Sequence, residues 1–206
     1  MSAAAPRPSL SVRDLTVRRG ERTLFAGLNF AAGAGETVLL RGPNGSGKTS
    51  LLLAIAGFLR PDAGTIAFGS GEETPPALHL MLPLPGLKPR LTVGENLAFW
   101  RTVNGADGLA AADALDRVGL GGLGELEAGH LSTGQLRRLA LARLLVSQRP
   151  IWLLDEPTSA LDAEGDGLVA GLIDAQCAAG GIVIAATHHD LALKAPATSI
   201  DLGQPA

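Results

Sequence analysis

An eight-residue glycine-rich stretch constrains the fold of this chain more than any other feature. Residues 42–49 read Gly-Pro-Asn-Gly-Ser-Gly-Lys-Thr, which fits the pattern of Gly, four residues, Gly, Lys and then Ser or Thr. The apolar stretch 36–40 before it is typical of a strand, and residues 49–59 after it are typical of a helix. Glycines in such a loop let backbone N–H groups point at phosphate oxygens, and the helix N-terminus adds its positive dipole end. A simple turn with an exposed lysine would show the same letters, but the flanking strand and helix favour a phosphate-binding loop.

Two adjacent carboxylates support this interpretation. If residues 42–49 form a phosphate-binding loop, Lys48 neutralises the β- and γ-phosphates of a nucleotide, and the Thr49 hydroxyl binds Mg²⁺. Residues 151–154 form an apolar, strand-like run that ends at Asp155 and Glu156. Asp155 is a candidate to hold the magnesium ion through water, and Glu156 to orient or deprotonate the attacking water. Alone, two acids after a strand are more typical of a solvated turn or helix cap; beside a phosphate-binding loop, the catalytic interpretation is favoured.

Composition excludes several classes of protein. The 206 residues carry 17 Lys+Arg against 20 Asp+Glu, a net charge of -3, and no basic tract, which argues against nucleic-acid binding. The longest apolar run, residues 51–59, is far shorter than the ~20 residues of a membrane-spanning helix. Residues 1–9 are Ala/Pro-rich without the apolar core of a signal peptide, so we expect a disordered tail. The single cysteine, Cys177, excludes an intramolecular disulfide and a Cys-based zinc site, which fits the reducing cytosol.

The remaining segments indicate an α/β fold. Residues 10–17 and 21–30 predict an antiparallel hairpin, and 64–68 and 77–82 predict further strands. Thr92 with Glu95, and Ser132 with Gln135, have the spacing of capping boxes that open helices. Helices are expected over 92–100, 106–118 and 132–145, and the Gly/Ala-rich residues 119–129 are expected to form a flexible connection. Residues 151–154 and 181–186 are continuous apolar runs, each followed by a helix-like stretch, as in a parallel sheet buried on both faces.

Residues 131–135, Leu-Ser-Thr-Gly-Gln followed by Arg137 and Arg138, resemble the signature motif of ATP-binding cassette (ABC) ATPases. An ordinary capped helix start would explain these residues alone, but two more motifs follow in the family's order. Residues 159–162 resemble the D-loop, and Thr187-His188 after an apolar strand resembles the switch histidine. The resemblance implies a P-loop NTPase fold with a mostly parallel sheet, an N-terminal antiparallel β subdomain and a small helical subdomain. It also implies one nucleotide-binding domain over residues 10–206, with a helical insertion at about 92–145.

The same resemblance implies a composite ATP site between two copies of the chain. ATP would bring the pair together and hydrolysis would release it, which would drive a partner. His189 is a weaker candidate for the switch position than His188, and we expect His79 and His130 to be structural. The implied site comprises ATP-binding Gly42, Pro43, Asn44, Gly45, Ser46, Gly47, Lys48, Thr49 and Arg19; magnesium-binding Thr49 and Asp155; catalytic Glu156 and His188; Ser132, Thr133, Gly134 and Gln135 of the other copy; and Ser159 and Asp162 of the D-loop.

Three secondary stretches narrow the resemblance. Residues 21–28, 85–97 and 180–183 are similar to those of the ATPase subunits of bacterial cytochrome c maturation systems, which are linked to haem export. The similarity implies a homodimer of peripheral subunits on the cytoplasmic face of the inner membrane. Separate integral membrane subunits would handle haem, and residues 82–90 would dock to them.

The chain also departs from the family pattern at three positions. Leu84 stands where the family has a glutamine that touches magnesium and the attacking water, and residues 1–134 contain no glutamine. The chain has no tyrosine, and Arg19, whose guanidinium plane can stack on a base, takes the position of the adenine-stacking aromatic residue. Thr133 replaces a glycine of the commonest signature. Two alternatives therefore stay open: a degenerate cassette that binds ATP with little hydrolysis, and a cassette of another ABC transporter. A soluble ABC ATPase acting on DNA or ribosomes fits poorly, because those usually carry two cassettes or long coiled coils.

Overall fold

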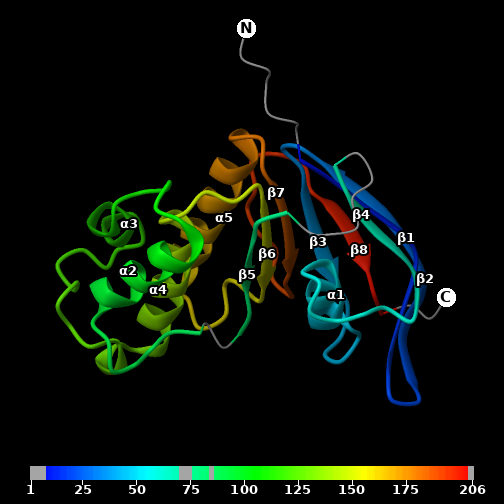
Figure 1. Ribbon diagram of the computed structural model, residues 1–206, viewed down its shortest axis with the longest axis horizontal. Coiled ribbons are helices and arrows are strands. Elements are labelled where there is room, and N and C mark those ends of the chain that lie inside the picture. The colour runs from blue at the N-terminus through cyan, green and yellow to red at the C-terminus, as the bar shows by residue number, and fades with distance from the viewer. Residues whose placement is uncertain (1–7, 70–75, 84–85, 204–206) are drawn as a thin grey trace, which may run out of the picture. The chain divides into compact units, whose positions relative to one another are not determined.

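A computed structural model describes residues 8–69, 76–83 and 86–203 (Figure 1). Its contacts divide the chain into two compact units. Unit 1 comprises Met1–Leu80, Arg149–Glu156 and Gly171–Ala206, and unit 2 comprises Met81–Gln148 and Pro157–Ala170. The elements in chain order are β1 (Ser9–Arg19), β2 (Arg22–Gly33), β3 (Thr37–Arg41), α1 (Lys48–Ile55), β4 (Ala63–Phe68), β5 (Leu78–Met81), α2 (Val93–Asn104), α3 (Ala111–Arg117), the 3₁₀ turn η1 (Ala128–His130), α4 (Thr133–Leu145), β6 (Ile151–Asp155), α5 (Ala163–Ala178), β7 (Ile182–Ala186) and β8 (Thr198–Asp201).

The central sheet of unit 1 has the strand order β5-β6-β7-β3-β8. β3 pairs in parallel with β7 and β8, and β6 pairs in parallel with β7. Every residue of β6 and β7 is buried, which explains why both strands are apolar without alternation. The parallel arrangement places the carboxyl ends of β3, β6 and β7 at one edge of the sheet, which is where ligands bind in such folds.

The antiparallel sheet of unit 1 has the order β2-β1-β4. Its strands β1 and β2 form the predicted hairpin, although both are longer than the sequence indicated, and Ser9 already belongs to β1. Leu10, Val12, Leu15 and Val17 of β1 are fully buried and join one hydrophobic core with side chains of α1 and the parallel sheet. Burial of this shared apolar face is what stabilises the fold of unit 1.

Both predicted capping boxes open helices of unit 2. The Thr92 hydroxyl accepts a hydrogen bond from Glu95 N at 3.1 Å, and Glu95 Oε2 accepts one from Thr92 N at 2.7 Å at the start of α2. Ser132 and Gln135 make the same reciprocal pair at the start of α4. α5 begins in unit 2 and ends in unit 1.

The expectation of a flexible connection over residues 119–129 is wrong. Backbone hydrogen bonds tie this stretch to the start of α2: Val93 N donates to Leu126 O at 2.9 Å, and Gly94 N donates to Gly124 O at 2.8 Å. Gly94 permits this contact, because a Cβ there would lie 3.2 Å from Gly124 O. The small residues therefore let two backbone segments approach closely.

Three further predictions are corrected. The first helix ends at Ile55 instead of residue 59, because the chain turns at Gly57, whose φ is 77°. Residues 106–110 are not helical; Leu109 N bonds instead to Leu145 O at 2.8 Å, and α3 starts at Ala111. No helix follows β7 within the described residues: positions 187–197 are irregular and lead to β8, which periodicity did not indicate. Each helix among the described residues is too short or too polar to cross a lipid bilayer.

Candidate active site

The phosphate-binding loop follows β3 in unit 1 and is held in shape by two glycines. Gly42 and Gly47 adopt φ angles of 128° and 104°, which side-chain-bearing residues rarely adopt. A Cβ at Gly47 would also lie 3.0 Å from Leu24 Cβ and 3.0 Å from a ring carbon of Phe25. The loop therefore packs directly against the hairpin, and a glycine is required at position 47 both by backbone conformation and by space.

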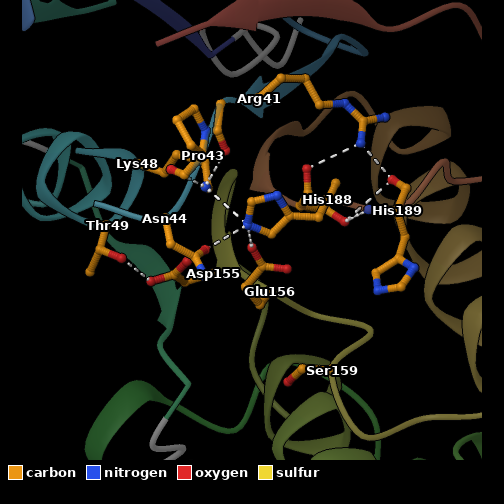
Figure 2. Close-up of polar contacts among 12 residues, drawn as sticks. Arg41, Pro43, Asn44, Lys48, Thr49, Asp155, Glu156, Ser159, His188 and His189 are labelled. Atoms are coloured by element: carbon orange, nitrogen blue, oxygen red, sulfur yellow. Dashed lines mark hydrogen bonds and ion pairs between the residues drawn. The ribbon is translucent and has the colours of Figure 1, made fainter. Parts of the chain in front are cut away.

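Lys48 folds back over this loop. Its Nζ donates to Gly42 O at 2.7 Å and to Pro43 O at 3.2 Å, and the residue is buried (Figure 2). Ser46 is buried in the same loop, and its Oγ has no hydrogen-bond partner among the described residues. Buried hydroxyls in folded proteins nearly always have partners. A cationic nitrogen, an unsatisfied hydroxyl and backbone amides in one loop fit a phosphate group.

Thr49 and Asp155 bring two oxygens together at the end of β6. The Thr49 hydroxyl donates to Asp155 Oδ2 at 2.6 Å, and Asp155 is only 2% exposed (Figure 2). Mg²⁺ prefers hydroxyl, carboxylate and water oxygens, and it usually binds through one or two protein groups beside nucleotide phosphates. The donor set of these two residues therefore fits a nucleotide-bound magnesium ion.

Glu156 and His188 meet across the carboxyl ends of β6 and β7. His188 Nε2 lies 3.3 Å from Glu156 Oε1, 3.0 Å from Asn44 Oδ1 and 3.2 Å from Lys48 Nζ. Figure 2 shows the imidazole at the centre of these groups. The Glu156 side chain is 23% exposed, so it is accessible to water. The arrangement joins a carboxylate that can accept a proton to a histidine that can contact a bound phosphate.

The backbone at Glu156 is in an unfavourable conformation. Glu156 has a positive φ of 48°, which residues other than glycine rarely adopt. The Glu156 N–H donates to Ala186 O at 2.8 Å. Such conformations cost on the order of 1–3 kcal/mol and cluster at functional sites. The bond to the end of β7 maintains the strained turn, which directs the carboxylate toward His188 (Figure 2).

The other histidines and Arg19 lie elsewhere. Among the described residues, His189 contacts the site through its backbone, and its ring points away from Glu156 in Figure 2. His79 is 2% exposed and packs edge to face against Trp152, in agreement with a structural role. His130 is exposed in η1. Arg19 is exposed at the end of β1, beside the hairpin turn.

The signature and D-loop residues lie in unit 2. The side chains of Ser132 and Gln135 cap α4, while Thr133 is exposed and Gly134 is half-buried. Gly134 packs against the D-loop, because a Cβ there would lie 3.0 Å from Ala160 O, and Ala160 itself has a φ of 64°.

Two arginines of α4 hold the D-loop within unit 2. The buried Arg137 donates to Ser159 Oγ and, at 3.4 Å, to Ser159 O. Asp162 Oδ1 accepts from Gly165 N at 2.9 Å and lies 3.7 Å from Arg138 Nη2. The sequence placed both arginines beside the signature but did not indicate these contacts. Leu84, the largest departure from the family pattern, lies outside the described residues.

Arg41 is a residue of this site that sequence reasoning missed. It ends β3, and its guanidinium donates to Thr187 O at 3.1 Å and to His189 O at 2.7 Å. The only signal in the sequence is a basic residue between an apolar strand and the glycine-rich loop, a position that carries no chemistry by itself.

Comparison with known proteins identifies the family. The sequence profile described as ABC transporter matches residues 25–159. This chain belongs to the ABC transporter family. It is 52% identical over 189 residues to the cytochrome c biogenesis ATP-binding export protein CcmA of Rhodopseudomonas palustris (strain BisB5), covering 90% of this chain and 94% of that protein. It is 48% identical over 195 residues to the protein of the same name from Rhizobium etli, covering 90% of each.

Solved ABC structures confirm the fold. An ABC transporter ATP-binding protein from Pyrococcus furiosus matches with a TM-score of 0.83 and 27% identity, covering 94% of this chain and 97% of that one. A bacterial Atm1-family ABC exporter solved with ATP bound matches with a TM-score of 0.76 and 26% identity, over 91% of this chain and 35% of the exporter. The chain is thus an ABC ATP-binding subunit with the P-loop ATPase fold, as the sequence motifs predicted.

Proposed function

We propose that this chain is the ATP-hydrolysing subunit of a transporter complex that serves cytochrome c maturation, through haem export or release of a haem carrier. The observation that carries the proposal is the identity of 52% over 90% of the chain to a protein named for cytochrome c biogenesis export. In this proposal, residues 10–206 act as one nucleotide-binding domain. It is a peripheral subunit on the cytoplasmic face of the inner membrane, and integral membrane subunits that handle haem are its partners.

The geometry of unit 1 supports hydrolysis of ATP. Lys48, the loop amides and the Ser46 hydroxyl hold the phosphates, and Asn44 and His188 contact the terminal one. Glu156 accepts a proton from the water that attacks the γ-phosphate. The 3.3 Å contact between Glu156 and His188 keeps the carboxylate beside the group that senses the phosphate. Arg19 stacks on the adenine with its guanidinium plane.

Magnesium is the implied cofactor, and Thr49 and Asp155 are the residues that would hold it. When bound, the ion neutralises negative charge on the β- and γ-phosphate oxygens. The chain's own part is to keep the Thr49 hydroxyl and the Asp155 carboxylate together, which their 2.6 Å hydrogen bond does.

A second copy of the chain completes the proposed site. Ser132, Thr133, Gly134 and Gln135 of that copy contact the γ-phosphate, and the start of α4 offers its positive dipole end. Ser159 and Asp162 belong to the D-loop between the two copies. ATP therefore holds the dimer closed, and hydrolysis opens it.

A complementation experiment tests the biological role. A bacterial strain that lacks its own cytochrome c biogenesis ATP-binding export protein receives this chain or its Glu156→Gln variant, and covalently bound haem in c-type cytochromes is measured. Restoration by the natural chain and not by the variant is expected. Membrane subunits of an unrelated transporter that copurify with the chain, together with failure to restore haem attachment, would favour the cassette of another transporter.

A binding module with little hydrolysis is the second candidate. The absence of any glutamine in residues 1–134 favours it, because Leu84 at the expected position cannot bind a cation or orient water. Measurement of steady-state ATP hydrolysis for Leu84→Gln decides between the two. A large gain in rate over a nearly inactive natural chain would support the binding module, whereas comparable rates in the variant and an active natural chain would show that hydrolysis tolerates Leu84.

A further inference from the structure

We propose that Arg41 is a positioning residue for ATP hydrolysis, which holds His188 in place by fixing the peptide groups on both sides of it. The inference rests on the proposed function, because it gives His188 a role in turnover. Within the part of the chain that the structure describes, the Arg41 guanidinium contacts two backbone carbonyls and the Asp190 carboxylate, and none of the side chains proposed to bind ATP or magnesium, so its effect is indirect.

The position of Arg41 follows from the sheet. β3 ends at Arg41 and β7 ends at Ala186, and these parallel neighbours pair up to Leu40 and Ala186. The pairing continues one step further, because Thr187 N donates to Leu40 O at 3.3 Å. The side chain of Arg41 therefore starts beside the irregular segment that carries His188.

The guanidinium binds this segment at three points. Its Nη1 donates to Thr187 O at 3.1 Å and to His189 O at 2.7 Å (Figure 2). Its Nη2 donates to Asp190 Oδ1 at 2.9 Å. The two carbonyls are those of the residues directly before and after His188. A further bond within the segment tightens the turn, because His189 N donates to Thr187 Oγ1 at 3.0 Å.

This arrangement requires the fork of a guanidinium. One terminal nitrogen carries two N–H groups, and each of them serves a different carbonyl, which a single lysine ammonium on a flexible stem matches poorly. The Arg41 side chain is only 23% exposed, so its bonds are partly shielded from water. The Asp190 side chain is fully exposed, and a surface ion pair of this kind contributes little to the stability of the turn. The bonds to the two carbonyls are therefore the ones that hold the turn.

Other hydrogen bonds also constrain this segment: Thr187 Oγ1 donates to His189 O at 3.3 Å, and Lys194 N donates to Asp174 Oδ1 at 3.1 Å, further along the chain from His188. Residues 187–197 contain no regular structure, and the neighbouring side chains of His189 and Asp190 are exposed. The His188 side chain is 43% exposed, yet its Nε2 must lie within 3.0–3.3 Å of Asn44, Lys48 and Glu156. Without Arg41 the turn loses both carbonyl bonds, and the imidazole moves away from these groups.

Steady-state ATP hydrolysis of the chain, purified with its membrane subunits, tests the proposal. For Arg41→Ala we expect kcat to fall on the order of 10- to 100-fold with little change in KM for ATP, as small displacements of a catalytic group produce. Arg41→Lys should recover part of the rate, and free guanidinium, against an equal concentration of sodium chloride, should raise the rate of Arg41→Ala. Arg60→Ala, which removes an exposed arginine of unit 1, is the matched control and should behave as the natural chain.

A double-mutant cycle separates positioning from general structural support. If Arg41 acts through His188, adding Arg41→Ala to a His188→Ala variant should cause no further loss of kcat. Losses that multiply would overturn the proposal, and so would an Arg41→Ala variant as active as Arg60→Ala. In both cases an inactive Glu156→Gln variant would show that the proposed function itself stands. If Arg41→Ala does not fold, as judged by its thermal melt, Arg41→Gln replaces it in the same cycle.

Discussion

Replacing Thr49 with valine removes one hydroxyl and keeps the shape of the side chain. That hydroxyl donates a 2.6 Å hydrogen bond to Asp155, a carboxylate that is 2% exposed. Hydrogen bonds to charged groups contribute about 1.5–3 kcal/mol, and because Thr49 is exposed we take the lower end, about 1.5 kcal/mol. In a chain of this size each kcal/mol shifts Tm by about 2–4 °C, so Thr49→Val should melt about 3–6 °C lower without nucleotide.

The same substitution separates the magnesium contact from the phosphate contacts. Thr49→Val should still bind ATP in the presence of a chelator, while the gain in affinity on adding Mg²⁺ should disappear. Thr49→Ser keeps the hydroxyl and should restore both the Tm and the response to Mg²⁺. Calorimetric titration of ATP with and without Mg²⁺ measures this. A full response to Mg²⁺ in Thr49→Val would refute the assignment of Thr49 and Asp155 as its oxygen donors.

Other substitutions test the loop and the core. Gly47→Ala should lower the Tm and ATP affinity together, because its positive φ costs about 1–2 kcal/mol and the new Cβ meets the Phe25 ring; thermal melts with and without ATP detect this. Ser46→Ala should weaken ATP binding. Because it deletes a buried hydroxyl that has no partner among the described residues, the nucleotide-free protein should be as stable as the natural chain or up to about 1–2 kcal/mol more stable. Ser11→Ala, the control, should leave ATP binding unchanged. Burial raises the pKa of the Cys177 thiol, so the folded protein should lose stability as the pH rises past the point where the unfolded thiol ionises. Denaturant titrations at neutral and alkaline pH should show this loss for the natural chain and not for Cys177→Ala.

The elements that the sequence predicted well are those specified by local chemistry. The strand over residues 36–40, the glycine-rich loop and the start of the helix after it, and the capping boxes at Thr92 and Ser132, depend on neighbours in sequence and are confirmed. The order of motifs also sufficed to predict the family, which the comparisons confirm.

The elements that were missed depend on contacts between distant parts of the chain. β8 is short and mostly exposed, and it exists because Val38 to Arg41 of β3 pair with it. Residues 106–110 share the apolar periodicity of the stretch that continues to residue 118, but the bond from Leu109 N to Leu145 O holds them in an irregular path. Arg41 was missed for the same reason: its role depends on β3 and β7 lying side by side, which no local pattern states.

ATP hydrolysis by the Glu156→Gln variant tests the central claim most directly. The substitution keeps the size of the side chain and its reach to His188, but an amide cannot accept the proton of the attacking water. With the membrane subunits present, we expect the variant to bind ATP as tightly as the natural chain and to lose its turnover. Equal turnover in the two forms would contradict the role of Glu156 as the base, because the group assigned to activate water would then be dispensable.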